Sequence, residues 1–291
     1  MRGKLFFAGL ILSLSGVAAS AQDVTAVPIR NDLYCSGIVS SEAIPRDTYV
    51  ITGEGSNYKI TFQEGDYVYV NRGANEGVKV GDEFSAIRHT EDLDHTEWTK
   101  WQFLILRKMG TLWEDEGRVR VVVVNPHTSV AQVEKSCNYL QRGDTLLPFV
   151  ERPAPPLKSE DKFDRFAPPS GKATAMIITG KGYLSELGSN DIFYVNLGSA
   201  QGVRVGDYFR IFRYTGTEHE AAFQTKRFAF NADNWNGVYG YGSVPPKWKW
   251  DNTPREVIGE GIVVRTSPNS SSVLLTFGLR EAYAGDYIEI E

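Results

Sequence analysis

The residues best suited to acid–base or metal chemistry gather in one short stretch of the sequence. His89 and His95 flank Glu91, Asp92 and Asp94, a composition that could ligate zinc or a hard cation. Their spacing matches no known ligand pattern, and a solvated acidic loop explains it better. The chain has no His-Glu-x-x-His and no Gly-x-Ser-x-Gly, and its carboxylates are scattered. We therefore expect a protein without catalytic activity, cofactor or metal.

A second group of residues is suited to binding. All six tryptophans fall in two stretches, 89–116 and 214–258, and the second also holds a Tyr-Gly-Tyr-Gly run. Such aromatic residues could form a sugar-stacking or protein-docking surface, or a satellite core that pins each stretch to its domain. The candidate binding residues are Trp98, Trp101, Trp113, Trp235, Tyr239, Tyr241, Trp248 and Trp250. We expect an exposed surface in the second stretch only, around Trp235, Tyr239 and Tyr241.

One piece of the first stretch has helical spacing. Trp98, Trp101, Ile105 and Met109 recur at intervals of three and four residues, and Gly110 could end the helix. The same run could also pair as a strand.

These two stretches interrupt two copies of one sequence unit. Residues 65–88 and 190–213 are identical at 12 of 24 positions, which indicates a repeated folding unit. The match extends upstream, where Val50–Gly53 resembles Ile177–Gly180. It also extends downstream, where Pro126–Asp144 aligns with Pro268–Asp286 without a gap.

Each copy alternates short strand-like segments with turn residues. At least five such segments in roughly 100 residues predict an all-β protein with two similar small antiparallel barrels or sandwiches in tandem, each with an aromatic-rich insertion. Glycine permits positive φ and aspartate bonds to nearby backbone, so the Gly-Asp pairs are interpreted as turns. The turn residues are Gly77, Gly81, Asp82, Gly143 and Asp144 in the first copy, and Gly202, Gly206, Asp207, Gly285 and Asp286 in the second.

The ends of the chain and its middle set the domain boundaries. Residues 1–21 have a basic start, an apolar run and an Ala-Ser-Ala cleavage site, which is typical of a signal peptide. Residues 32–149 form the predicted first β domain and 172–291 the second. Between them, residues 150–171 form a proline-rich linker, expected to be extended and semi-rigid. No other segment is apolar and long enough to span a membrane.

The two cysteines are Cys35 and Cys137. Export would place them where disulfides persist, and a bond between them would tie together the two ends of the first domain. Two free buried thiols are the alternative. The second copy has Leu279 at the position of Cys137, so the crosslink is not intrinsic to the unit.

In both copies a Gly-Val-x-Val-Gly-Asp element is followed by a strand and closed by a second Gly-Asp. Through this pattern the chain resembles the C-terminal domain of flagellar assembly protein T, and similar modules accompany LysM-type envelope proteins. The residues that carry the resemblance are Gly73, Gly77, Val78, Gly81, Asp82, Gly143, Asp144 and their second copies. The resemblance implies a periplasmic, non-catalytic β domain in envelope assemblies. Here the module is doubled and no LysM motif is visible.

Two hypotheses for function follow. The first is a non-catalytic, exported binding or scaffold protein of the cell envelope, whose partner is an envelope protein or peptidoglycan or another polysaccharide. The alternative is a secreted polysaccharide-active hydrolase with its site in the tryptophan-rich insertions. A net charge of −5 argues against a nucleic-acid partner, because nucleic-acid binding favours a basic face.

The leader generates the first testable prediction. Cleavage after Ala21 should give a mature chain that begins at Gln22 and is found in the periplasm or outside the cell. N-terminal sequencing of the exported protein checks this. An intact Met1 in the membrane fraction would contradict it.

Overall fold

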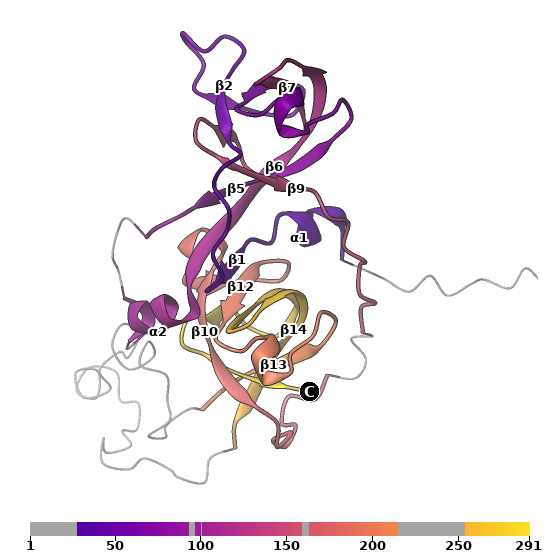
Figure 1. Cartoon of the computed structure of the whole chain (residues 1–291). Coiled ribbons are helices and arrows are strands. Elements are labelled where there is room, and N and C mark those ends of the chain that lie inside the picture. The colour runs from indigo at the N-terminus through magenta and orange to yellow at the C-terminus, as the bar shows by residue number, and fades with distance from the viewer. Residues whose placement is uncertain (1–27, 93–96, 100, 159–162, 215–253) are drawn as a thin grey trace, which may run out of the picture.

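The computed structural model describes residues 28–92, 97–99, 101–158, 163–214 and 254–291 (Figure 1). Most of the regular structure in these residues is antiparallel sheet, and it forms two barrel-like units that lie one above the other in Figure 1. The predicted all-β class with two similar tandem units is therefore confirmed.

The second unit is a closed six-stranded barrel. Its strands follow the spatial order β10, β12, β15, β14, β13 and β17, and β10 pairs with β17 to close it. The bounds are β10 Thr174–Gly180, β12 Ile192–Val195, β13 Tyr208–Arg213, β14 Glu256–Ser267, β15 Ser270–Gly278 and β17 Tyr287–Ile290.

The first unit has the same order of equivalent strands but is a curled, open sheet. The order is β2, β4, β7, β6, β5 and β9, and β1 pairs with the start of β6 off this path. Between β2 and β9 the contact is a single bridge, Tyr49 to Thr145, with a few backbone hydrogen bonds. The bounds are β1 Ile38–Ser40, β2 Val50–Gly53, β4 Tyr67–Val70, β5 Glu83–His89, β6 Thr111–Val124, β7 Ser129–Ser136 and β9 Thr145–Pro148.

Short elements are repeated as well. Two-stranded pairs join β3 (Thr61–Phe62) to β8 (Leu140–Gln141) and β11 (Glu186–Leu187) to β16 (Ala282–Tyr283). A 3₁₀ turn follows β4 in the first copy and β12 in the second: η1 (Ala74–Glu76) and η4 (Ser199–Gln201). One sequence unit thus specifies one topology twice.

The turn glycines adopt backbone conformations that other residues rarely reach. Gly77 has φ 87° and Gly202 has φ 86°, at the same point of each copy. The aspartate side chains stabilise the turns by hydrogen bonds to the backbone. Asp82 accepts a hydrogen bond from the Lys79 amide at 2.9 Å, and Asp207 accepts one from the Arg204 amide at 2.8 Å. These contacts agree with turn chemistry at the Gly-Asp pairs.

Each barrel encloses its own apolar core, because side chains alternate along the strands. In β4, Val68 and Val70 point inward and are buried, while Tyr67 and Tyr69 point outward and are each 38% exposed. In the equivalent β12 all four residues are buried. The outer face of the second barrel is therefore covered.

The cover comes from the first unit. We define the arm as α1 (Arg30–Tyr34), β1, α2 (Gln102–Met109) and residues 111–115 of β6. In Figure 1, β6 runs from the upper barrel down to the lower one. The arm contributes Leu33, Val39, Met109 and Leu112 to one cluster, and the second barrel contributes Ile178, Ile192, Tyr194, Ile262, Val264 and Leu274.

Helix α2 resolves the choice between helix and strand left open by the sequence. It spans Gln102–Met109 and ends at Gly110, whose φ is 131°. A Cβ atom at Gly110 would lie 2.1 Å from the Ser40 carbonyl oxygen, so glycine also permits close approach to β1. The insertion is shorter than expected, because β5 continues to His89 and β6 starts at Thr111.

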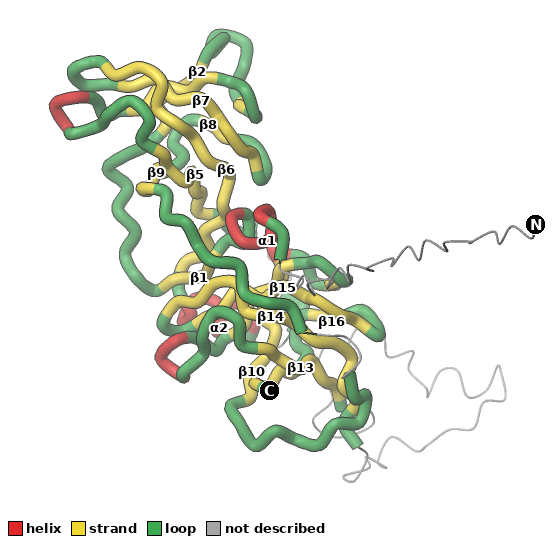
Figure 2. Tube along the Cα trace, turned by 90° about the vertical axis from the view of Figure 1, so that its right-hand side faces the viewer, coloured by secondary structure: helices red, strands yellow, loops and turns green. Residues whose placement is uncertain are grey.

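The linker runs down the outside of the second barrel (Figure 2). Its described residues contain no helix or strand, as expected for an extended segment. They are nevertheless docked: Lys158 Nζ lies 2.8 Å from carboxylate oxygens of Glu260 and of Glu291, and Arg165 pairs with Glu256 at 2.6 Å. The linker therefore belongs to the surface of the second barrel.

The predicted disulfide between Cys35 and Cys137 is present, with a Cα–Cα distance of 5.3 Å. Cys35 follows α1 and Cys137 follows β7, so the bond fixes the start of the arm to the first barrel.

Loss of this bond should destabilise the protein. Replacing both cysteines by serine opens a loop whose ends are 102 residues apart, and we expect the free energy of unfolding to fall by about 3–5 kcal/mol. Chemical denaturation of the oxidised protein and of the double variant measures this. Reduction of the wild type should lower its stability similarly but leave the double variant unchanged, and equal stability of all forms would contradict the prediction.

Candidate binding site

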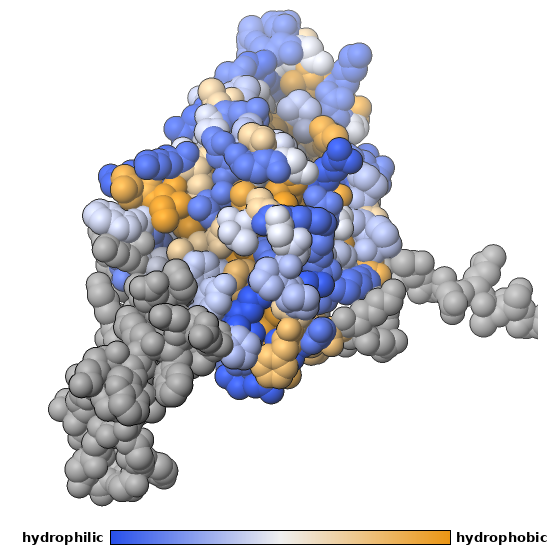
Figure 3. Space-filling model, turned by 90° about the horizontal axis from the view of Figure 1, so that it is seen from below, coloured by the Kyte–Doolittle hydropathy of each residue, from blue (hydrophilic) through white to orange (hydrophobic). Residues whose placement is uncertain are grey.

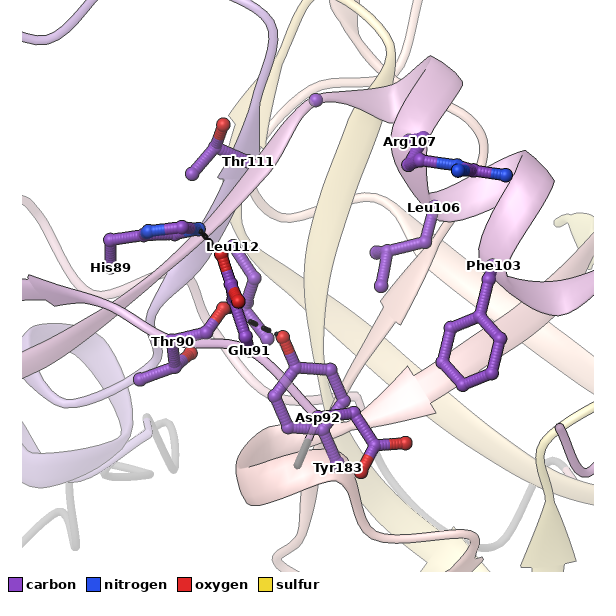
Figure 4. Close-up of a pocket in the computed structure, with 11 residues that line it drawn as sticks. His89, Thr90, Glu91, Asp92, Phe103, Leu106, Arg107, Thr111, Leu112 and Tyr183 are labelled. Carbon is purple, nitrogen blue, oxygen red and sulfur yellow. Dashed lines mark hydrogen bonds and ion pairs between the residues drawn. The ribbon is translucent and has the colours of Figure 1, made fainter. Parts of the chain in front are cut away.

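A cavity of about 500 Å³ opens beside α2, where the arm meets the second barrel. Phe103 and Leu106 from α2 and Leu112 from β6 supply apolar surface (Figure 4). Tyr183, from the 3₁₀ turn η3 (Lys181–Tyr183) of the second unit, closes one side. The full lining is His89, Thr90, Glu91, Asp92, Phe103, Leu106, Arg107, Gly110, Thr111, Leu112 and Tyr183. We call this cavity the α2 groove.

Hydrogen bonds hold the walls of the α2 groove in place. The buried Gln102 side chain donates to the Ile178 carbonyl of the second barrel at 2.7 Å and accepts from the Trp98 amide at 2.7 Å. The Tyr183 hydroxyl donates to the Thr90 carbonyl at 2.7 Å. Both units therefore contribute to one site.

The rim of the α2 groove carries charge of both signs. Glu91 and Asp92 lie on one side and Arg107 on the helix, and His89 Nε2 is 3.8 Å from Glu91. Burial, together with the negative charges of Asp92 and Glu91, raises the pKa of Tyr183 to about 12. The phenol therefore stays protonated at neutral pH and is a hydrogen-bond donor, not a base.

The expected acidic stretch lies partly at this rim. Among the residues that the structure describes, no three His, Cys, Asp or Glu side chains are placed to hold a metal ion. Asp94 and His95 lie outside the described residues. The described part offers apolar contact with flanking charge, which suits the docking of a side chain of a partner.

The structure separates the tryptophans of the first insertion. Trp101, just before α2, is 58% exposed, and Leu104 on the helix is 40% exposed. Figure 3 shows hydrophobic surface gathered on the side of the molecule where α2 lies. Trp98 is half-buried. An aromatic and apolar patch thus adjoins the α2 groove.

Trp113 is a correction to the predicted binding surface. It is only 6% exposed, because it lies where β6 pairs with β1, and it packs with Ile38 and Ile87. The Arg46 guanidinium covers its ring at 5.1 Å from the ring centre. The remaining candidates, Trp235, Tyr239, Tyr241, Trp248 and Trp250, lie outside the described residues.

Sequence reasoning missed a buried ion pair that is repeated in both units. Arg88 binds Asp144 through two hydrogen bonds of 2.8 and 2.9 Å, and Arg213 binds Asp286 through two of 2.8 and 2.6 Å. Both aspartates are 1% exposed. The signal was present, because an arginine ends the repeated block in both copies and the aspartates belong to the second Gly-Asp pairs.

Three consecutive acidic residues of β6 are also buried, and no sequence pattern singles them out. Glu114 accepts a hydrogen bond from the Gly182 amide at 2.8 Å. Asp115 accepts one from the Gly37 amide at 2.9 Å and pairs with Arg265 at 3.3 Å. The first two carboxylates thus join the arm to the second barrel.

Glu116, the third of these residues, is fully buried in the first unit. Its carboxylate lies 3.3 Å from Arg88 but makes no hydrogen bond in the described part of the chain. Burial raises the pKa of Glu116 from 4.5 to about 7, with Arg88 opposing this and the charges of Asp144 and Glu114 adding to it. The second copy has Ile258 at this position.

No protein-family model matches the chain, and no curated protein matches its sequence significantly. Among the described residues, no helix is long and apolar enough to cross a membrane.

Glu116 should make stability depend on pH. Because its pKa is raised in the folded state, its contribution is complete below about pH 4.5 and is lost as the pH rises to about 7. Relative to Glu116→Gln, the wild type should lose roughly 2–3 kcal/mol of unfolding free energy across this range. Denaturant titrations at several pH values measure the difference.

Glu91→Gln is the matched control, because the Glu91 side chain is 72% exposed, and it should follow the wild type. A constant difference between wild type and Glu116→Gln from pH 4.5 to pH 7 would contradict the assignment.

Proposed function

We propose that the protein is a non-catalytic binding or scaffold protein of the cell envelope, exported to an oxidising compartment, and that it docks a partner protein at the α2 groove. The observation that carries this is the apolar floor of the groove beside exposed Trp101 and Leu104. Exposed aromatic and apolar residues around a concave site are typical of docking surfaces.

The charges at the rim favour a particular chemistry in the partner. Glu91 and Asp92 stand on the barrel side of the groove, whereas Arg107 stands on α2. An apolar side chain flanked by a basic residue would fill the floor and face the two carboxylates. This favours a protein segment over a neutral glycan chain.

Two further features support an exported location and a role in an envelope assembly. Disulfides persist in exported proteins, and here one fixes the start of the arm. The turn pattern resembles the module of flagellar assembly protein T and of LysM-type envelope proteins, which implies work in an envelope assembly. A periplasmic location after cleavage of the leader is part of the same proposal.

Removal of the exposed patch tests the docking role. The double variant Trp101→Ala, Leu104→Ala should lose capture of envelope proteins while its free energy of unfolding changes by less than about 2 kcal/mol, since both side chains are partly exposed. Leu279→Ala is the matched control, because Leu279 is 43% exposed on the second unit. Pull-down from solubilised envelopes and thermal denaturation are the measurements.

Equal capture by the double variant and the wild type would contradict docking at the groove. Sedimentation with purified peptidoglycan distinguishes the source of binding: co-sedimentation that the double variant retains would point to glycan recognition elsewhere. Release of soluble sugars from peptidoglycan would contradict the non-catalytic assignment.

A further inference from the structure

The second barrel holds an extended segment on its outer face, and hydroxyl groups of the barrel bind the backbone of that segment. The Tyr194 hydroxyl donates to the Ser36 carbonyl at 3.0 Å, and Ser272 Oγ donates to the Gly37 carbonyl at 2.8 Å. Ser267 Oγ donates to the Val39 carbonyl at 2.7 Å. The segment is therefore held by its backbone carbonyls together with the buried side chain of Val39.

A row of four side chains across four strands forms the centre of this face. Tyr194 of β12 is paired with Ser272 of β15, and Ser272 is paired with Arg265 of β14. On the other side of Tyr194, β10 pairs through Thr179, and Ile178 at the adjacent register shift lies on the same outer face. Ile178 and Tyr194 are fully buried beneath the arm.

The first barrel has an equivalent row, by alignment of the two copies, in which the isoleucine and the tyrosine are kept and two valines replace the serine and the arginine. Ile51, Tyr69, Val130 and Val123 stand where Ile178, Tyr194, Ser272 and Arg265 stand in the second. The pairing is also the same: Tyr69 is opposite Val130, and Val130 is opposite Val123. We call these four residues the tyrosine row.

No described part of the chain covers the tyrosine row as the arm covers its counterpart. Ile51 is 40% exposed, Tyr69 38% and Val123 49%, against no exposure for Ile178 and Tyr194. Tyr49 and Tyr67, 40% and 38% exposed, extend the apolar surface along the strands. An exposed apolar row at a position that serves as a docking face in the other copy needs a physical reason.

We propose that the tyrosine row is a second docking site, which binds an extended, uncharged segment of a partner protein as the second barrel binds residues 36–40. Tyr69 would donate its hydroxyl hydrogen to a backbone carbonyl of that segment, as Tyr194 does. The row lies on the first barrel and does not depend on the α2 groove.

The size of the row favours a single segment over a second copy of this chain. Four strands spaced about 4.8 Å apart give roughly 300 Å² even when the neighbouring row, about 7 Å away, is counted with the tyrosine row. A stable dimer buries about 800 Å² on each partner. The neighbouring row is polar, since Gln132 and Arg120 lie beside Tyr67 and Arg120 pairs with Glu83 at 2.5 Å.

The charges also distinguish this site from its counterpart. In the second barrel Arg265 pairs with Asp115 of the arm. The first barrel has Val123 at that position, and the tyrosine row contains no charged side chain. A bound segment with a carboxylate at the equivalent point would lose its solvation without gaining a partner, so an uncharged segment fits best.

A peptide from this chain is the direct probe. A fluorescent peptide with the sequence of residues 33–41, with serine in place of Cys35, carries the segment that occupies the equivalent face. We expect it to bind the full-length oxidised protein saturably in fluorescence anisotropy. Tyr69→Ser and Val130→Glu should each weaken binding at least tenfold, and a peptide of scrambled sequence should bind weakly or not at all.

Tyr58→Ser is the matched control, because Tyr58 is 83% exposed in the loop after β2 and should leave binding unchanged. Thermal denaturation identifies any variant that fails to fold, and the remaining row variant then decides. Absence of saturable binding up to about 1 mM, or binding by both row variants that equals binding by the wild type, would overturn the proposal. A wild-type dimer in sedimentation that Tyr69→Ser dissociates would also overturn it, by making a second copy the occupant. The result of this peptide-binding test does not depend on whether the α2 groove captures envelope proteins.

Discussion

The contact between the arm and the outer face of the second barrel is the constraint on which the rest of the structure depends. It removes six barrel side chains from water and replaces their solvation with aliphatic contacts from Leu33, Val39, Met109 and Leu112. Hydroxyl groups of the barrel satisfy the carbonyls of the extended segment, so burial leaves few backbone groups unpaired there. The two units consequently meet through a packed interface.

This contact explains why two copies of one unit differ. The strand order is shared, but β12 is buried on both faces, whereas β4 keeps tyrosines on its outer face. The second sheet closes through a ladder between β10 and β17, and the first remains curled. In the first unit β6 extends into the arm, and the disulfide fixes the other end of the arm to its own barrel.

The α2 groove exists because of the same contact. Helix α2 packs against the second barrel through Met109 and Gln102, and Tyr183 reaches back to Thr90 of the first unit. Buried carboxylates lie along the intervening part of β6, where Glu114 and Asp115 bind the second barrel and the arm. A binding surface that draws residues from both units is therefore coupled to the way in which they pack.

The sequence by itself determined the local and repeated features. Alternating apolar residues, turn glycines and two copies of one block specified an all-β chain with one topology used twice. The expected export to an oxidising compartment indicated the Cys35–Cys137 bond. Helix α2 was foreseen as one of two options from its spacing. Only the tertiary structure decided that Trp113 is buried, that the linker docks and that Phe103, His89 and Tyr183 share a cavity. The reason is physical: periodicity records which face of an element is apolar, but not which distant segment covers that face.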